Sequence, residues 1–305
     1  MPKIFLVGTG GMLPLKSRWL TSCYIEHNGK AVLIDCGEGT QIALNEFGCK
    51  ISRIDLILVT HRHADHVSGL PGFLLSLGNT SRTKPLDIYV PEGDKVIIQN
   101  LLCICENLPY EIHIRELSVK KECSFSAENI DPMLQIRSLP LKHSTACLGY
   151  SLLFGKKPVF LPIKAKELNV PVRMWKMLHS GNSVTLDDGT TINADDVTEN
   201  SRNPVKITYI TDTLPFDKIS EFASEADLFI CEGMYGELDK KESMNQKGHM
   251  LMQDACRLAK SASARELWLT HYSPALKNPQ EYQSILNDIF ENTIISADGQ
   301  QKEIL

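Results

Sequence analysis

The residues from His61 to His66 include four side chains that can bind a metal: three histidines and one aspartate. They follow the apolar run 54–60, which predicts a buried strand. Because alternate residues of an extended segment share a face, His61 and His63 can converge on one ion. Asp65 and His66 can face the same way only if the chain turns, so we expect them at a second ion. The ligand types and spacing suit zinc better than the alternative, a solvated histidine-rich turn.

Other polar side chains follow predicted strands far along the chain. His143 comes after the strand at 133–139, Asp212 after 206–210 and His271 after 266–270. An active site on an α/β scaffold is commonly assembled in this way, at one edge of a sheet. The sequence therefore predicts two zinc sites, with His61, His63 and His143 on one ion, Asp65, His66 and His271 on the other, and Asp212 as a bridge.

Two zinc ions about 3.5–4 Å apart, bridged by a carboxylate and a hydroxide, suit in-line attack on phosphorus. The metals lower the pKa of the bound water and neutralise charge on the phosphoryl oxygens. Asp65 could also accept a hydrogen bond from the hydroxide and steer it. Asp35, after the predicted strand 30–34, could be a ligand or a helix cap, but we expect it to bond back to the metal-binding loop.

The composition is ordinary for a soluble globular protein, with 43% hydrophobic and 23% charged residues in 305. The sequence has neither a signal-peptide pattern nor an apolar stretch of about 18 residues, so we expect a cytoplasmic protein without a membrane span. Nine cysteines, spaced singly, predict reduced thiols. The formal net charge of −5 disfavours a chain coated in positive charge but leaves room for a local basic patch.

Residues 156–204 differ from the rest of the chain. Trp175 lies among clustered cations, and an Asp-Gly turn inside 183–192 predicts a small hairpin. This composition predicts an inserted arm, either an ordinary long loop with a solvated charged face or a basic, aromatic-bearing grip on a polyanion. The cations are Lys156, Lys157, Lys164, Lys166, Arg173 and Lys176.

The ligand order His-x-His-x-Asp-His, then His143, Asp212 and His271, resembles the metallo-β-lactamase superfamily. Residues 8–18, with Gly8-Thr9-Gly10 followed by Pro14, Lys16 and Arg18, and residues 35–41 more narrowly resemble the ribonuclease Z family. The resemblance runs from about residue 3 to 275. It implies an α/β (α+β) fold, a four-layer αβ/βα sandwich of two sheets between helices. Residues 1–305 would form one domain, with 156–204 as a flexible exosite arm inserted in it.

This resemblance implies a zinc-dependent endoribonuclease that removes 3′ trailers from precursor tRNA. A metal-bound hydroxide would attack the phosphodiester and leave a tRNA 3′-hydroxyl, with two Zn²⁺ per subunit. It also implies a homodimer, in which the arm of one subunit grips RNA that the other cuts. The RNA contacts would come from the 14–18 loop and the arm, through Lys16, Arg18, Lys164, Lys166, Arg173 and Lys176.

By the same resemblance, Glu232 and His249 would pass a proton to the leaving 3′ oxygen. A carboxylate-oriented imidazole is a competent general acid for an alkoxide leaving group in any case. The residues around this pair depart from the family pattern. Residues 231–234 read Cys-Glu-Gly-Met where His-Glu-Ala-Thr is common, and 249–251 read His-Met-Leu where His-Ser-Thr is common.

Two other functions fit the sequence. One is a dizinc hydrolase of small phosphodiesters or other esters with a vestigial RNA arm, which the departures from the motif favour. The other is a tRNA-binding protein without turnover, for which we expect salt-sensitive binding that survives His63→Ala. The complete set of seven metal ligands favours an enzyme.

Overall fold

The computed structural model describes residues 1–155, 158–199 and 204–304, so Lys156 and Lys157 of the predicted arm lie outside the described residues. The chain divides into two compact units. The larger comprises Met1–Phe154 and Lys206–Leu305, and the smaller comprises Gly155–Val205.

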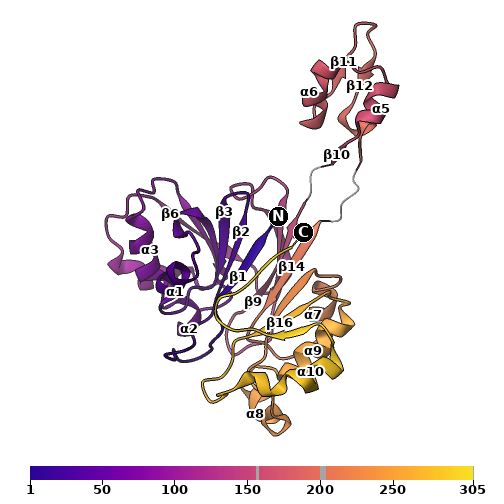
Figure 1. Ribbon diagram of the computed structural model, residues 1–305. Coiled ribbons are helices and arrows are strands. Elements are labelled where there is room, and N and C mark those ends of the chain that lie inside the picture. Colours follow the sequence, from indigo (N-terminus) through magenta and orange to yellow (C-terminus); the bar gives the residue numbers. More distant parts are fainter. Residues whose placement is uncertain (156–157, 200–203, 305) are drawn as a thin grey trace. The chain divides into compact units, whose positions relative to one another are not determined.

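The larger unit contains two seven-stranded sheets (Figure 1). The first has, in spatial order, β18 (Gln300–Glu303), β1 (Lys3–Gly8), β2 (Ser22–His27), β3 (Lys30–Ile34), β4 (Ile54–Leu58), β5 (Leu86–Pro91) and β6 (Ile112–Leu117). The second has β17 (Thr293–Ile295), β16 (Leu267–Thr270), β15 (Leu228–Glu232), β14 (Val205–Ile210), β9 (Leu148–Phe154), β8 (Leu134–Pro140) and β7 (Cys123–Ser126).

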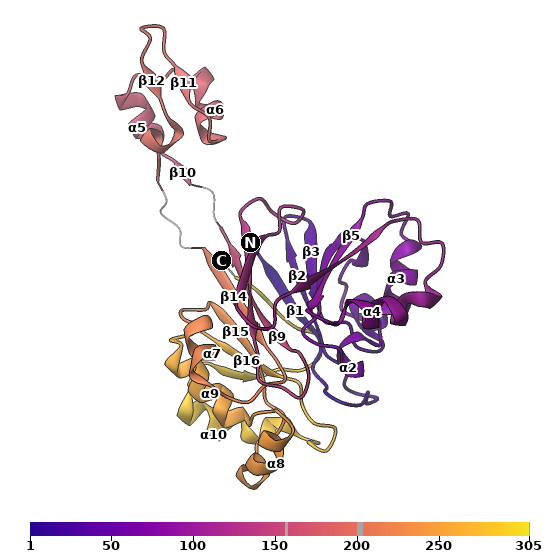
Figure 2. The same ribbon diagram turned by 180° about the vertical axis from the view of Figure 1, so that it is seen from behind.

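Helices cover the outer face of each sheet, as Figures 1 and 2 show from opposite sides. Against the first sheet lie α1 (Thr40–Glu46), α3 (Leu70–Gly78) and α4 (Lys95–Leu101), with the short α2 (Ala64–Val67) after β4. Against the second lie α7 (Asp217–Phe222), α9 (Met252–Ser261) and α10 (Gln283–Ile289), and α8 (Lys241–Gln246) precedes α9. This is the helix–sheet–sheet–helix order predicted from the sequence.

Each sheet buries apolar side chains on both faces. One cluster joins the first sheet to α1 and α3, and a second joins the other sheet to α7, α9 and α10. Between the sheets, the Tyr150 hydroxyl donates to the Val59 carbonyl (2.7 Å), and the Leu148 N–H donates to the Thr60 carbonyl (2.9 Å). These bonds attach the second sheet to the end of β4, where the metal-binding stretch begins.

The run of strand β4 is apolar because it pairs in parallel with both β3 and β5 and is covered on both faces. The β2–β3 hairpin turns at Asn28 and Gly29, which have φ values of 50° and 78°. Those left-handed conformations are what an Asn-Gly turn provides at low steric cost. The predicted strand and hairpin are confirmed.

The smaller unit has a core of its own. Its elements are β10 (Val159–Phe160), α5 (Pro162–Glu167), α6 (Trp175–His179), β11 (Val184–Thr185), β12 (Thr191–Ile192) and β13 (Thr198–Glu199). Strand β10 pairs with β13, and β11 with β12 through the predicted Asp-Gly turn, where Gly189 has a φ of 87°. Six side chains are buried together: Ala165, Val170, Leu178, Val184, Ile192 and Val197.

Two expectations from composition concern the whole chain. All nine cysteines are free thiols, as their single spacing predicted. Among the described residues, no helix is long and apolar enough to cross a membrane.

Candidate metal centre

The four predicted ligands of the 61–66 stretch lie on both sides of a turn. His63 has extended backbone angles (φ −62°, ψ 149°) and precedes the first residue of α2. Helix α2 then carries Asp65 and His66, both buried. The change from extended to helical backbone lets two neighbouring residues face the same centre as His61 and His63.

Two candidate ligands of the second sheet follow strand ends in backbone conformations that few residues adopt. Asp212 follows β14 with a φ of 45°, and His271 follows β16 with a φ of 59°. Asp35 after β3 has a φ of 58°. Positive φ is uncommon outside glycine, although Asp and His tolerate it better than most residues. At these positions it directs a carboxylate or imidazole from the strand end into the site.

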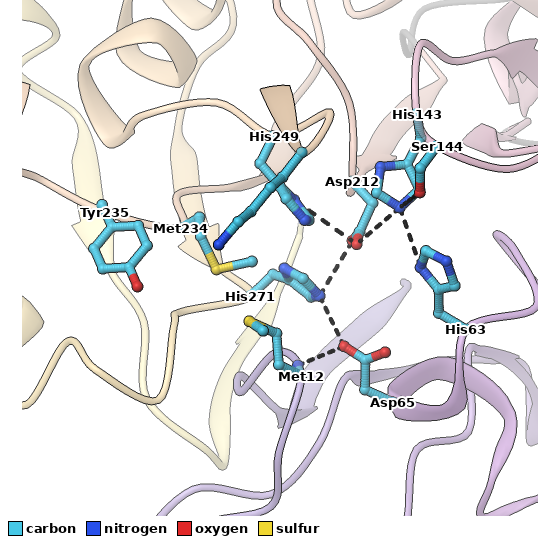
Figure 3. A pocket seen from close by; sticks show the side chains of 11 residues that line it. Met12, His63, Asp65, His143, Ser144, Asp212, Met234, Tyr235, His249 and His271 are labelled. Carbon is cyan, nitrogen blue, oxygen red and sulfur yellow. Dashed lines mark hydrogen bonds and ion pairs between the residues drawn. The ribbon is translucent and has the colours of Figure 1, made fainter. Parts of the chain in front are cut away.

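The predicted ligand atoms lie in two groups (Figure 3 shows five of the residues). In the first group, Nδ1 of His63 is 3.0 Å from Nε2 of His61 and 3.1 Å from Nε2 of His143. In the second, Nε2 of His66 is 3.1 Å from Nε2 of His271. The groups are His61, His63, His143 and Asp212, and Asp65, His66 and His271.

Asp212 belongs to the first group and also faces the second. Its Oδ2 is 3.6 Å from Nε2 of His61, and its Oδ1 is 3.2 Å from Nε2 of His271. A buried carboxylate with one oxygen toward each group has the geometry that a bridging ligand requires. The seven residues come from four segments that are distant in sequence, and the structure brings all of them together.

The charges of these groups suit a divalent cation. Burial lowers the pKa of His61, His63 and His143, so these imidazoles are neutral and have lone pairs to donate. Burial opposes ionisation of Asp212, but His271, His66 and His61 outweigh it and hold its pKa well below the usual range. Neutral imidazole nitrogens 3.0–3.1 Å apart repel unless a proton or a cation lies between them. The donor set therefore fits a metal such as zinc.

Hydrogen bonds fix the outer nitrogens of two of the imidazoles, those of His66 and His143. Nδ1 of His66 is 2.8 Å from Oδ2 of Asp35, which also accepts the hydroxyl of Thr60. Nδ1 of His143 donates to the carbonyl of Gly248 (3.0 Å). Such contacts set the ring orientation of metal-binding histidines. The expectation that Asp35 bonds back to the metal-binding loop is confirmed.

The His271 ring packs against backbone. A Cβ added to Gly11 would lie 2.6 Å from Cε1 of His271, so only glycine fits there. The Gly11 N–H donates to the carbonyl of Tyr272 (3.0 Å), and Tyr272 N–H donates to Thr9 (2.9 Å). The glycines after β1 thus allow a close approach to a candidate ligand.

Glu232 and His249 form a bonded pair beside the two groups. Nδ1 of His249 is 2.9 Å from Oε2 of Glu232, which is fully buried. Burial would lower the pKa of His249, but Glu232 outweighs it and raises that pKa to about 9. The other carboxylate oxygen, Oε1, accepts the Thr213 N–H (2.6 Å). The pair holds an imidazolium whose Nε2 is free of Glu232.

The departures from the family motif pack against each other. Met234 and Leu251 are both 1% exposed and form one apolar cluster. The Cys231 thiol lies 3.8 Å from the Met250 sulfur. Two contacts between apolar or sulfur-bearing side chains therefore join the segment of Glu232 to that of His249.

The two groups and His249 open into one pocket with a volume of about 320 Å³. Sequence reasoning missed several residues that line it: Met12, Ser144, Met234, Tyr235 and Lys247. Met12 has a φ of 68°, and its N–H donates to Oδ2 of Asp65 (2.6 Å). In the sequence, the only indication of Met12 is its position directly after Gly10-Gly11. It contacts Asp65 through a backbone N–H, and a backbone group cannot be recognised from the residue type.

The candidate RNA-binding residues are not among the residues that line this pocket. Lys16 is exposed. Arg18 is half-buried and donates to the carbonyls of Ser273 and Leu276 (both 3.2 Å), with its guanidinium 5.3 Å from the Tyr272 ring. The arm residues belong to the smaller unit and are exposed: Lys164, Lys166, Arg173 and Lys176.

Curated relatives match along the whole chain. Ribonuclease Z of Lachnospira eligens is 44% identical over 305 residues, which covers 100% of this chain and 98% of that protein. Ribonuclease Z of Clostridium acetobutylicum is 44% identical over 311 residues, with the same coverage. The model of the family described as Anti-Pycsar protein Apyc1 matches residues 2–161, the part that carries His61–His66 and His143.

Solved structures show the same fold. The short form of human tRNase Z has a TM-score of 0.69 and 21% identity, and the match covers 99% of each chain. YhfI of Bacillus subtilis, a metallo-β-lactamase fold protein, has a TM-score of 0.67 and 18% identity, with 99% and 98% covered. The predicted metallo-β-lactamase fold is confirmed. Residues 2–161 fall within the Apyc1 family, and with relatives 44% identical from end to end the chain belongs to the ribonuclease Z family.

Proposed function

We propose that the protein is a zinc-dependent endoribonuclease that removes 3′ trailers from precursor tRNA and leaves a 3′-hydroxyl. The observation that carries this proposal is that two metal-donor groups and His249, which is bonded to the buried Glu232, open into one pocket. The chain around them is 44% identical to proteins named ribonuclease Z. Solved tRNase Z structures share its fold.

The two donor groups would hold two Zn²⁺ per subunit. One ion would take the three imidazoles of the first group, the other would take Asp65, His66 and His271, and Asp212 would bridge them. Bound there, zinc lowers the pKa of a water molecule and polarises the phosphoryl oxygens. Asp65 would orient the attacking water, because its Oδ2 is already fixed by the Met12 N–H.

His249 would protonate the leaving 3′ oxygen. Its Nδ1 is bonded to Glu232, so Nε2 is the nitrogen available to donate into the pocket. Expulsion of an alkoxide needs a proton, and a general acid typically contributes about 10²–10⁴-fold in rate. Glu232 would hold the imidazole in place and stabilise its charged form.

The arm would bind the body of the tRNA. Its four described cations are exposed on a unit with its own core, and Trp175 is only half-buried. Exposed lysines and arginines attract a phosphate backbone without reading sequence. We also propose a cytoplasmic homodimer, in which the arm of one subunit serves the site of the other, and sedimentation at micromolar concentration tests the dimer.

Cleavage of a defined RNA tests the function. Zinc-loaded protein should cut a precursor tRNA with a 3′ trailer once, after the nucleotide that follows the acceptor stem, and the tRNA fragment should accept ligation to a 5′-phosphorylated oligonucleotide. His63→Ala, which removes a donor from the first group, should abolish cutting. An uncut precursor would overturn the proposal.

The alternative function has its own outcome in the same experiment. Hydrolysis of a small aryl phosphodiester without cleavage or binding of the precursor tRNA would identify a small-molecule phosphodiesterase with a vestigial arm. Tight RNA binding with no cleavage of either substrate would identify a binding protein.

A further inference from the structure

One wall of the pocket differs from the metal-donor side. It is lined by Met234 and Tyr235, with Met12 next to Asp65 at its border, whereas the far side carries His63 and His143. Figure 3 shows Tyr235 and Met234 on the side of His249, away from His63. Two thioethers and a phenol ring form an apolar surface next to a site for a phosphodiester.

We propose that this wall, centred on Tyr235, is the subsite for the base of the nucleotide immediately 5′ of the cleaved bond. The inference rests on the proposed function and deepens it, because it names the part of the substrate that occupies the apolar half of the pocket. It treats Tyr235 as a substrate-binding residue rather than part of the metal centre.

The ring of Tyr235 is held in place before any ligand binds. Its hydroxyl accepts a hydrogen bond from the Ser273 hydroxyl (2.5 Å), and its carbonyl accepts the Met252 N–H (2.9 Å). A Cβ on the next residue, Gly236, would lie 2.3 Å from the Tyr282 ring, so the backbone has little room to shift. A fixed aromatic ring loses little entropy when a base stacks on it.

The position of the proton donor, His249, determines which nucleotide has its base against the Tyr235 wall. Cleavage that leaves a 3′-hydroxyl expels the 3′ oxygen of the nucleotide that the tRNA retains, and His249 would protonate that oxygen. Tyr235 forms a parallel bridge with Leu251, two residues after His249, so the ring and the donor come from paired segments. The nucleotide whose 3′ oxygen faces His249 therefore has its base on the Tyr235 side.

The chemistry of the wall suits a base. The whole pocket, metal-donor side included, has a volume of about 320 Å³, at the lower end of ligand pockets, which span roughly 300–1,000 Å³. Every base has a π-face that stacks on an aromatic ring, and methionine sulfur contacts ring edges favourably. A surface with few hydrogen-bonding groups discriminates by stacking area rather than by base edge, so purines should be preferred over pyrimidines without strict identity.

The contact between Tyr235 and the base is tested by changing the protein and the RNA, first separately and then together. Wild type and Tyr235→Ala are each given a precursor tRNA with adenine, or an abasic ribose, at the nucleotide 5′ of the cleavage point. Loss of a stacked base costs about 5- to 150-fold in binding. We expect kcat/KM to fall by such a factor on either change alone and hardly further when both are combined. Tyr235→Phe keeps the ring but loses the hydrogen bond from Ser273, so it should lose much less activity than Tyr235→Ala.

The outcomes separate this inference from the proposed function. If wild type cuts the adenine and abasic substrates equally well, the base subsite is wrong and the endoribonuclease stands. Equal losses from Tyr235→Ala on both substrates would show a structural role for Tyr235 and would also overturn the subsite. If wild type cuts neither RNA, the proposed function itself fails.

A binding measurement on the wild-type protein guards against a misfolded variant. The cleavage product is a tRNA that ends at the nucleotide following the acceptor stem; with 2-aminopurine at that position it is a ligand that cannot be cut. Stacking quenches the fluorescence of this base, so zinc-loaded wild type should quench it on binding, and Tyr235→Phe should do the same. Binding of the RNA, seen by a mobility shift, with unchanged or increased fluorescence would overturn the subsite.

Discussion

The metal-donor cluster and the basic arm both concentrate charged or polar groups, but they differ in solvation. The cluster draws Asp212, His61 and His271 from distant segments into contact, and each of them is at most 2% exposed. The arm cations come from one continuous segment and are exposed. Arg173 has an ion pair, with Asp187 at 3.7 Å, and both its members are largely exposed.

This difference matches the two tasks that we propose. Groups removed from water interact strongly and hold fixed positions, which bond cleavage requires. Exposed cations interact weakly with any one partner but together attract a polyanion at long range. The cluster should therefore respond sharply to single substitutions, and the arm only to several substitutions or to deletion.

The largest expected effect is at the bridge between the two donor groups. Asp212→Asn removes the charge that faces both groups, so bound metal should fall and kcat/KM should drop by about 10³-fold or more, on RNA and small phosphodiesters alike. Metal analysis and hydrolysis of an aryl phosphodiester measure this. Asp217→Asn, at an exposed position of α7, is the matched control. If Asp212→Asn kept full metal content and activity, the cluster would not be more sensitive to a single substitution than the arm.

The proton donor should show its effect on one substrate only. His249→Ala should lower kcat on precursor tRNA by about 10²–10⁴-fold, because the leaving alkoxide needs a proton. The same variant should lose little on a bis(4-nitrophenyl) phosphate substrate, whose phenolate leaves unaided. Equal losses on both substrates would assign His249 to metal binding instead, which its 3.8 Å distance from Asp212 makes a specific alternative.

Deletion of the arm should separate RNA binding from chemistry. Replacing residues 158–200 by a short Gly-Ser linker removes the smaller unit with its own core. We expect the aryl phosphodiester rate to stay within about two-fold of wild type, because the metal donors all lie in the larger unit, while KM for precursor tRNA rises. Unchanged RNA cleavage would show that the arm is dispensable.

Charge removal within the arm should act gradually. The triple variant Lys164→Gln, Lys166→Gln, Lys176→Gln removes three exposed cations. If all three contact phosphates, the slope of log K against log salt should become shallower by about two to three units. Fluorescence anisotropy at several salt concentrations measures it. A slope equal to that of wild type would contradict their role in RNA binding.

The smallest expected effect on RNA binding is at Arg18. Its guanidinium donates to the carbonyls of Ser273 and Leu276 in the chain segment after His271. Arg18→Met should lower the free energy of unfolding by about 1–3 kcal/mol, because hydrogen bonds from a charged group to buried carbonyls are lost. Urea denaturation measures this, and Lys16→Met is the exposed control. A changed salt slope with unchanged stability would instead show direct RNA contact.

Much of the fold followed from local patterns. The apolar run of β4, the Asn-Gly hairpin at 28–29 and the Asp-Gly turn at 188–189 each express a preference that acts over a few residues. The smaller unit was harder to predict. Its core collects single apolar residues from six short segments, none of which has a long periodic pattern.

The candidate ligands were visible because their residue types are rare and their spacing is regular. The wall around Met12 and Tyr235 was not visible, because methionine and tyrosine are ordinary core residues. The hydrogen bonds of Arg18 to two backbone carbonyls were likewise not visible in the sequence. Its partners are carbonyls some 255 residues away, and carbonyls have no sequence signature.

The sequence by itself determined which seven side chains could hold metal, because donor chemistry belongs to the residue and strand ends can be read locally. Only the tertiary structure decided how they meet: Asp212 facing both groups, Glu232 against His249, and an apolar wall beside both. These arrangements depend on where segments far apart in the chain lie in space. Burial then fixes their charges, and burial is a property of the packed protein rather than of any single residue.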